Sequence, residues 1–297
     1  MLRRFHLDEP ETVKDASDLL SRYGESAKIY AGGTELLLAM KEGLIQSERL
    51  VNVKKIPGLD EVKRIGDSVH IGALSTHRKL ENSAELQQSL PAFVQMEANV
   101  ANIRVREVGT VGGNLCFAEP HADPGILLLA LGAGVVAQNA SNMREIPMDN
   151  FFVDAFETCL KPDELLTEIR VPIPPPQSAV RYLKFGYLQR PSVGVALRLS
   201  LGDGGLIRDV RVAVGCAGPK PCRVEEAEEL LKGKGLQEAS ELIGEAGQIA
   251  GRAAEAIGDL HGSAEYKEHI IQVLLKRAFH QMVQEEFSSK GEGGPHA

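Results

Sequence analysis

The sequence predicts an α+β protein built of two domains, and three observations support this prediction. Four prolines fall within residues 172–176, a run that fits neither a helix nor a central strand, so we place the domain boundary there. Before this run, short β-like and helical segments alternate along the chain. After it, three β-like segments come first and only helical segments follow. The predicted domains are residues 1–176 and 177–287, and we expect the polar tail at 288–297 to be disordered.

The elements of the first domain follow from local patterns. An apolar stripe after Pro10, on residues three or four apart, predicts a helix that ends at Gly24. A strand at 27–30 then leads through a double-glycine segment into a helix at 35–40. Further strands are expected at 50–53, 62–65, 69–71, 135–138, 144–147 and 165–172, and further helices at 91–99 and 124–131.

The second domain begins with an antiparallel meander of three predicted strands. Val210, Val212 and Val214 alternate with Asp209 and Arg211, as in a strand with one buried and one wet face. The predicted strands are 182–185, 193–201 and 207–214, and the helices after them are 224–231, 236–257 and 264–284. We therefore expect a smaller C-terminal domain in which a three-stranded sheet is covered by helices.

Composition argues against several classes of function. The 297 residues contain 33 Lys+Arg against 41 Asp+Glu, a formal net charge of −8, which speaks against a nucleic-acid-binding surface. The longest apolar run, 126–137, is much shorter than the roughly 20 residues of a membrane span. No apolar segment follows the N-terminal arginines, so we expect a cytoplasmic protein without a transmembrane segment. The four cysteines include no C-x2-C pair, and we expect no metal site in this chain.

Two double-glycine segments are the candidates for a binding site. Paired glycines let backbone N–H groups converge on one point, and at a helix N-terminus these groups favour a phosphate. Two such segments could hold a diphosphate from both sides, although ordinary turns would give the same pattern. The candidate residues are Ala31, Gly32, Gly33, Thr34, Glu35 and Leu36 in the first segment and Gly109, Thr110, Val111, Gly112, Gly113 and Asn114 in the second.

A third glycine pattern is rejected as a binding site. Residues 132–137 match G-x-G-x-x-A, the dinucleotide-binding fingerprint, which requires a strand before it and a helix after it. Here a helical run precedes the glycines and a β-like segment follows them, so we do not expect a Rossmann site.

Five ordered motifs extend along nearly the whole chain. They are YAGGTEL at 30–36, IGA at 71–73, GTVGGN at 109–114 with Asp123 downstream, DELLTEI at 163–169 and GSAEY at 262–266. Taken together, these motifs resemble those of the FAD-binding subunit of the molybdenum hydroxylases. That family includes the medium subunit of aerobic carbon monoxide dehydrogenase and the FAD domain of xanthine dehydrogenase. The resemblance implies a FAD-binding domain of the vanillyl-alcohol oxidase (PCMH) type.

The resemblance also implies roles for single residues. Both double-glycine segments would hold the FAD pyrophosphate. Asp123 would accept hydrogen bonds from the cofactor's hydroxyl groups, unless it serves only as the N-cap of the following helix. Leu166 and Lys184 match positions that contact the flavin end across the domain boundary. Lys184 would place a positive charge near the flavin ring, although most lone lysines on strands are simply solvated.

The chain departs from its relatives at several positions. Val100 stands where the xanthine dehydrogenase branch has an aromatic residue, so ring stacking is not expected from that position. Tyr187 could shield the flavin ring, although a strand tyrosine more often only packs. Hydroxybenzoyl-CoA reductase carries an iron–sulfur cluster in this subunit, but this chain has no cysteine-bearing insertion. His121 resembles a general base, yet the flavin of this family passes electrons, so we expect no catalytic residue here.

An electron-transfer function is what the resemblance implies. A large molybdopterin subunit would oxidise the substrate, a small subunit with [2Fe–2S] clusters would relay the electrons, and FAD would pass them to NAD⁺, a quinone or oxygen. The expected assembly is a dimer of heterotrimers. One alternative is a stand-alone flavin-dependent reductase on the same fold, resembling the enzyme that makes UDP-N-acetylmuramic acid. The other is a binding module that has lost its cofactor, which substituted glycines would indicate.

Overall fold

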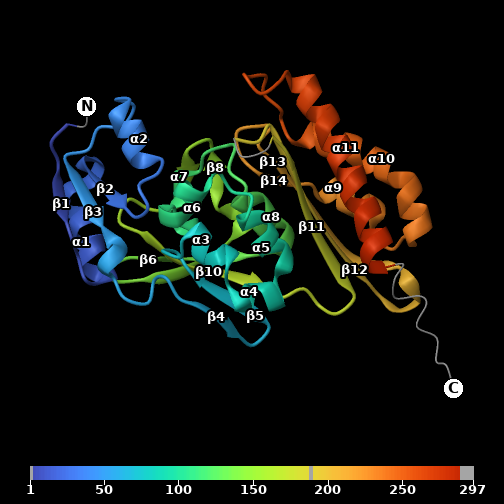
Figure 1. Ribbon diagram of the computed structural model, residues 1–297, viewed down its shortest axis with the longest axis horizontal. Coiled ribbons are helices and arrows are strands. Elements are labelled where there is room, and N and C mark those ends of the chain that lie inside the picture. The colour runs from blue at the N-terminus through green and yellow to red at the C-terminus, as the bar shows by residue number, and fades with distance from the viewer. Residues whose placement is uncertain (1–2, 187–189, 288–297) are drawn as a thin grey trace. The chain divides into compact units, whose positions relative to one another are not determined.

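The computed structural model describes residues 3–186 and 190–287, which form two compact units (Figure 1). The first unit draws on residues 1–119 and 132–172, and the second on residues 120–131 and 173–297. A short stretch within the first half of the sequence therefore belongs to the second unit. The division into contiguous domains at residue 176 stays a prediction. Tyr187 and the tail at 288–297 lie outside the described residues.

The first unit begins with a small parallel sheet in the strand order β1-β3-β2. Its strands are β1 (His6–Asp8), β2 (Ala27–Tyr30) and β3 (Arg49–Asn52), and helix α1 (Val13–Tyr23) joins β1 to β2. The side chain of Thr12 accepts a hydrogen bond from the backbone N of Asp15 at the start of α1, and Gly24 ends the helix at a φ of 50°. Ala16 and Leu20 of α1 belong to the buried core that this sheet forms.

An antiparallel sheet in the order β4-β5-β10-β6-β7 makes up the rest of the first unit's framework. Its strands are β4 (Val62–Ile65), β5 (Ser68–Gly72), β6 (Gly134–Gln138), β7 (Met143–Pro147) and β10 (Leu165–Pro172), and the separate hairpin strands are β8 (Phe152–Asp154) and β9 (Glu157–Thr158). The central strand β10 pairs with both β5 and β6, and its pairing with β6 shifts register between Leu166 and Glu168. Such a bulge bends the strand and redirects its side chains.

Short helices link these strands and carry the glycine segments. They are α2 (Leu36–Lys41), α3 (His77–Glu81), α4 (Ala84–Ser89), α5 (Pro91–Glu97), α6 (Ile103–Val108) and α7 (Val111–Phe117). The sequence predicts no helix between residues 99 and 124, and the structure corrects this, since α6 and α7 lie there. Two successive glycines disfavour a helix, but Thr110 caps α7 by accepting from the backbone N of Gly113.

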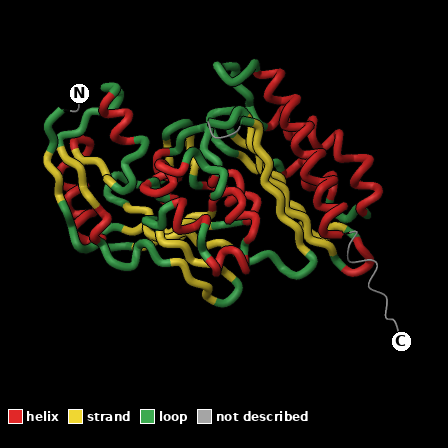
Figure 2. The backbone as a smooth tube through the Cα atoms, viewed as in Figure 1, coloured by secondary structure: helices red, strands yellow, loops and turns green. Residues whose placement is uncertain are grey.

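The second unit is an antiparallel sheet between helices, in the strand order β11-β12-β13-β14. Its strands are β11 (Ser178–Phe185), β12 (Val193–Leu201), β13 (Ile207–Gly215) and β14 (Cys222–Arg223), and its helices are α8 (Pro124–Leu131), α9 (Glu225–Leu231), α10 (Leu236–Ala253) and α11 (Ala264–Met282). The prediction of three strands was therefore one strand short. The fourth strand has only two residues, too few to show a β-period in the sequence. Figure 2 shows α10 and α11 running side by side along this sheet.

Both faces of β12 are covered, which explains its continuous apolar sequence. Val195 and Leu197 belong to the core cluster shared with α10 and α11. On the opposite face, a Cβ at Gly194 would lie 2.6 Å from the Cδ1 atom of Ile126 in α8. All eight residues of α8 are buried. The sheet is thus sandwiched, with α8 on one face and the C-terminal helices on the other.

Candidate functional site

The first double-glycine segment is a turn between β2 and α2. Gly33 has a φ of 74°, a left-handed conformation that glycine adopts without strain, and a Cβ there would lie 2.4 Å from the Tyr30 ring. A Cβ at Gly32 would lie 2.2 Å from the carbonyl oxygen of Val108. Backbone packing therefore requires glycine at position 32, and the left-handed conformation favours it at position 33.

The second segment joins α6 to α7. Gly109 ends α6, and Thr110 is the N-cap of α7. A Cβ at Gly112 would lie 2.6 Å from the Cβ of Ala73. The first turn of α7 therefore packs against Ala73, the residue that follows β5. The likeness of residues 71–73 to the family now has a physical reason, because only small residues permit this close approach.

The structure brings the two turns together within the first unit. A Cβ at Gly32 would lie 2.7 Å from the Cα of Gly109, and a Cβ at Gly109 would lie 3.5 Å from Thr34 Oγ1. The segments 31–36 and 109–114 therefore meet at one place, where residues 73–77 support the second of them.

The two turns differ in the hydrogen-bond donors that they leave open. In the second turn, the backbone N of Val111 donates to Ser75 O at 3.0 Å and that of Gly112 to Ala73 O at 2.9 Å. The N–H of Gly113 is engaged by Thr110 Oγ1, so the polar groups that remain are the side chains of Thr110 and Asn114. The first turn of α2 has no side-chain cap, but the backbone N of Leu37 donates to Gly33 O at 3.0 Å and that of Ala39 to Glu35 O at 2.9 Å. A ligand at this turn would therefore meet N–H groups that precede Leu37.

Asn114 provides the observation that tests whether FAD fits this place. Its Oδ1 atom is buried, and among the described residues it has no hydrogen-bond partner. An unsatisfied buried polar atom costs about 1–3 kcal/mol. The side-chain amide presents either its oxygen or its NH2 group by a simple flip, and the phosphate and hydroxyl oxygens of a dinucleotide would satisfy it. The residues present therefore fit a cofactor with a diphosphate.

In the second unit, Asp123 is the centre of a buried polar group. The Tyr182 hydroxyl donates to Asp123 Oδ1 at 2.6 Å, and Lys184 Nζ lies 3.0 Å from the same oxygen. The side chains of Asp123 and Lys184 are only 6% and 8% exposed, so this lysine is not a solvated surface residue. Burial, aided by the charge of Asp123, raises the pKa of Tyr182 well above its usual value, and the phenol stays protonated.

The other residues named from the sequence have varied surroundings. Leu166 is buried in β10 of the first unit, beside the bulge. Val100 is buried, and its backbone carbonyl oxygen accepts from Arg106 Nη1 at 3.0 Å. In the second unit, His121 Nε2 lies 3.2 Å from Asp259 Oδ2. All four cysteines are free thiols.

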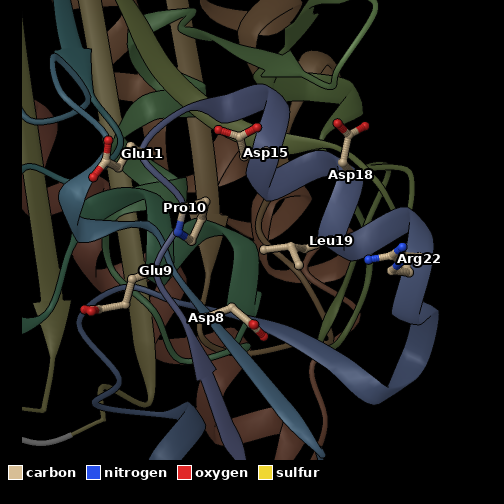
Figure 3. Close-up of a pocket in the computed structure, with 8 residues that line it drawn as sticks. All are labelled: Asp8, Glu9, Pro10, Glu11, Asp15, Asp18, Leu19 and Arg22. Carbon is tan, nitrogen blue, oxygen red and sulfur yellow. The ribbon is translucent and has the colours of Figure 1, made fainter.

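A hollow of about 780 Å³ lies on the first unit, and its lining includes no residue of the glycine turns (Figure 3). Its lining residues are Asp8, Glu9, Pro10, Glu11, Asp15, Asp18, Leu19 and Arg22. Five of these are acidic, and their charges would repel a diphosphate. Asp8 pairs with Arg49 and Glu9 with Lys55, so part of this charge is already neutralised within the protein. In the part of the chain that the structure describes, no group of His, Cys, Asp or Glu residues could hold a metal ion.

Comparison with known proteins identifies the family. Residues 3–174 match the family described as "FAD binding domain in molybdopterin dehydrogenase", and residues 189–282 match the "CO dehydrogenase flavoprotein C-terminal domain". The first match alone spans more than half of the chain. The chain belongs to the FAD-binding subunits of the molybdenum hydroxylases.

Relatives and a solved structure agree with this placement over nearly the full length. The chain is 35% identical to the nicotine 6-hydroxylase medium subunit of Paenarthrobacter nicotinovorans, over 90% of this chain and 93% of the relative. It is 31% identical to the carbon monoxide dehydrogenase medium chain of Hydrogenophaga pseudoflava, over 93% and 96% of the two chains. Its fold matches a chain of the carbon monoxide dehydrogenase structure from H. pseudoflava with a TM-score of 0.90, at 31% identity and over 94% and 97% of the two chains.

Membership of this family establishes the cofactor and the class of protein. The molybdenum hydroxylase flavoprotein binds FAD and is one subunit of a multi-subunit oxidoreductase, with the molybdenum and iron–sulfur centres in other subunits. The alternative of a stand-alone reductase is not favoured, because the matched relatives are medium subunits of larger enzymes. Among the described helices, none combines the length and the apolar character that crossing a membrane requires.

Proposed function

We propose that this flavoprotein subunit accepts electrons from a small subunit with [2Fe–2S] clusters and passes them to NAD⁺, a quinone or oxygen. A large molybdopterin subunit would oxidise the substrate, and two heterotrimers would form the working assembly in the cytoplasm. The medium-subunit names of its relatives support this arrangement, since they imply a smaller and a larger partner. Bound FAD supplies the redox chemistry, and this chain supplies binding, orientation and electrostatics.

The FAD diphosphate, in this proposal, is held by residues 31–36 and 109–114. The observation that carries the assignment is the unpaired buried Oδ1 atom of Asn114, next to the place where the two glycine turns meet. The first turn would contribute backbone N–H groups that precede Leu37, since those of Leu37 and Ala39 donate to Gly33 O and Glu35 O. The second would contribute the Thr110 hydroxyl and the Asn114 amide, because its own N–H groups are engaged inside the protein.

The residues of the second unit would serve the rest of the cofactor. Asp123, which also binds Tyr182 and Lys184, would accept from the cofactor's hydroxyl groups through its carboxylate. Its ion pair with Lys184 holds that lysine in a fixed position, as a contact to the flavin end requires. Leu166 would be the apolar contact of the flavin end from the first unit.

Replacement of Thr110 by valine tests the diphosphate assignment. The Thr110→Val variant loses a hydroxyl from the second turn, and we expect about tenfold weaker FAD binding, as for one hydrogen bond to a charged group. It also loses the cap of α7, which costs about 1 kcal/mol of stability. FAD affinity is measured by flavin fluorescence on the full chain, alone and in its complex.

The matched control for this experiment is Thr12→Val. Thr12 caps α1 through Asp15 N in the same way that Thr110 caps α7, but it lies outside both glycine turns. It should lose a similar amount of stability and keep its affinity for FAD. Equal FAD affinity of the two variants would contradict the assignment of the phosphate to the second turn.

A further inference from the structure

A buried histidine–glutamate pair lies beside the second glycine turn. His77 Nδ1 is 2.6 Å from Glu97 Oε2, and the two side chains are 3% and 0% exposed. His77 begins α3 and Glu97 ends α5, so two separate helices bring them together. Neither residue belongs to a recognisable motif, and sequence reasoning missed them both.

His77 contacts the turn in two ways. Its backbone N donates to the carbonyl oxygen of Gly109 at 3.0 Å. Its ring atom Cδ2 would lie only 3.3 Å from a Cβ on Gly109, so the imidazole packs closely against this glycine. Gly109 in turn touches Gly32 and lies close to Thr34. A continuous series of contacts therefore runs from Glu97 through His77 and Gly109 to the first turn.

Glu97 is an unfavourable residue for its surroundings. It is completely buried, and its Oε1 atom has no hydrogen-bond partner within the described part of the chain. Its neighbours on α5, Phe93, Val94 and Met96, are buried apolar side chains. A methionine would occupy a similar volume there without leaving a buried oxygen unpaired. Packing stability alone does not explain a carboxylate at this position.

We propose that Glu97 and His77 are positioning residues for FAD. The carboxylate fixes the orientation of the imidazole, the imidazole holds Gly109, and Gly109 keeps the two glycine turns at the spacing that the diphosphate requires. Neither residue needs to touch the cofactor. This inference rests on the proposed binding of the FAD diphosphate by these turns.

Two substitutions of Glu97 separate the hydrogen bond from simple packing. In Glu97→Gln an acceptor for the imidazole N–H remains, and FAD affinity should fall less than threefold. In Glu97→Met the acceptor is lost at similar volume, and FAD affinity should fall at least tenfold. The dissociation constant of FAD is measured by flavin fluorescence on the full chain in its complex, beside the thermal stability of each variant.

Glu228→Met is the matched control for loss of a buried carboxylate. Glu228 is 5% exposed on its side chain, accepts from Val212 N and pairs with Arg223, all within the second unit. This variant should lose stability and keep the wild-type affinity for FAD. If it lost FAD affinity as much as Glu97→Met, the effect would be one of general stability, and the proposal would be overturned.

The double variant His77→Leu/Glu97→Met shows whether Glu97 acts through His77. Once His77 is replaced, loss of Glu97 should cost no further FAD affinity, whereas additive losses would overturn the proposal. If Glu97→Met does not fold, His77→Gln takes its place, since it lacks the ring that packs on Gly109 and should weaken FAD binding at least fivefold. Unchanged binding in the folded variants overturns this inference alone. Failure of the wild type to bind FAD would instead contradict the proposed function.

Discussion

Among single residues, Gly32 is held in the tightest place of the two turns. A Cβ there would meet backbone atoms of both Val108 and Gly109, which cannot move aside as a side chain can. Gly32→Ala should therefore lower the free energy of unfolding by about 1–3 kcal/mol, the usual cost of overpacking, and should weaken FAD binding. Urea unfolding and an FAD titration measure the two effects.

Gly244→Ala is the control for that substitution. Gly244 lies within α10, and a Cβ there would meet nothing within 4 Å. The alanine should raise the free energy of unfolding by about 0.5–1 kcal/mol, because glycine is a poor residue inside a helix. If Gly32→Ala behaved like Gly244→Ala, the close contact between the two turns would not exist in solution.

The buried ion pair of Asp123 and Lys184 makes a second prediction at this scale. Lys184→Met removes the paired lysine of a buried carboxylate, and breaking a buried ion pair on one side costs about 3–5 kcal/mol of stability. The double variant Asp123→Asn/Lys184→Met removes both charges and should recover part of that loss. Chemical denaturation of the four proteins gives the comparison, and a double variant less stable than Lys184→Met would contradict it.

Among the elements, the first turn of α11 is joined to the preceding loop by an ion pair between Lys267 and Asp259. This pair makes the stability of the fold depend on pH in acid. Burial by itself would raise the pKa of Asp259, but hydrogen bonds from Lys267, from the backbone N of His261 and from His121 outweigh it and lower the pKa from 3.8 to about 2. A lowered pKa stabilises the fold above pH 3.8. This contribution is lost as the pH falls from about 4 towards 2.

Asp259→Asn tests that prediction. Asparagine does not titrate, so thermal unfolding of this variant should depend less steeply on pH between 4 and 2 than that of the wild type. At neutral pH the variant should also be less stable, because the buried Lys267 loses its partner. Parallel pH profiles of the two proteins would show that Asp259 has no such role.

The elements also show which parts of the fold a sequence can predict. The bounds of β2, α8, β10 and β12 agree with the expected ranges, since each has a strong apolar pattern and clear glycine or proline ends. Helix α7 was not predicted, because its glycines disfavour a helix. Tertiary contact decides this position, since Gly112 must lie against Ala73.

The candidate site, like the fold, was predictable from the sequence only in part. Its two segments follow from glycine chemistry and from the family resemblance, and the structure brings these segments together. The engagement of the second turn's N–H groups by residues 73–75 was not predictable, because it depends on chain packing. The pairing of Asp123 with Lys184 joins residues 61 positions apart, and no local pattern reveals such a contact.

For the whole molecule, the last prediction follows from the way in which the chain passes from the first unit to the second at residues 120–131 and then returns. Helix α8 belongs to the second unit, although residues on both sides of it belong to the first. A fragment of residues 1–176 therefore carries a fully buried apolar helix without the strands β12 and β13 that cover it. We expect this fragment to aggregate and to bind a hydrophobic dye, and co-expression of residues 177–297 to restore its solubility. Sedimentation checks both outcomes, and a monomeric 1–176 fragment would contradict them.

The same path sets an order of events when the protein is made. Helix α8 leaves the ribosome before the strands that cover it, and the end of β13 follows roughly 80 residues later. At about 5–20 residues per second, this apolar segment stays uncovered for roughly 4–16 s during synthesis. Its eight buried residues would then be a natural target for chaperones that hold nascent chains. The yield of this subunit in a cell should thus depend on chaperone supply, even where the finished protein is stable.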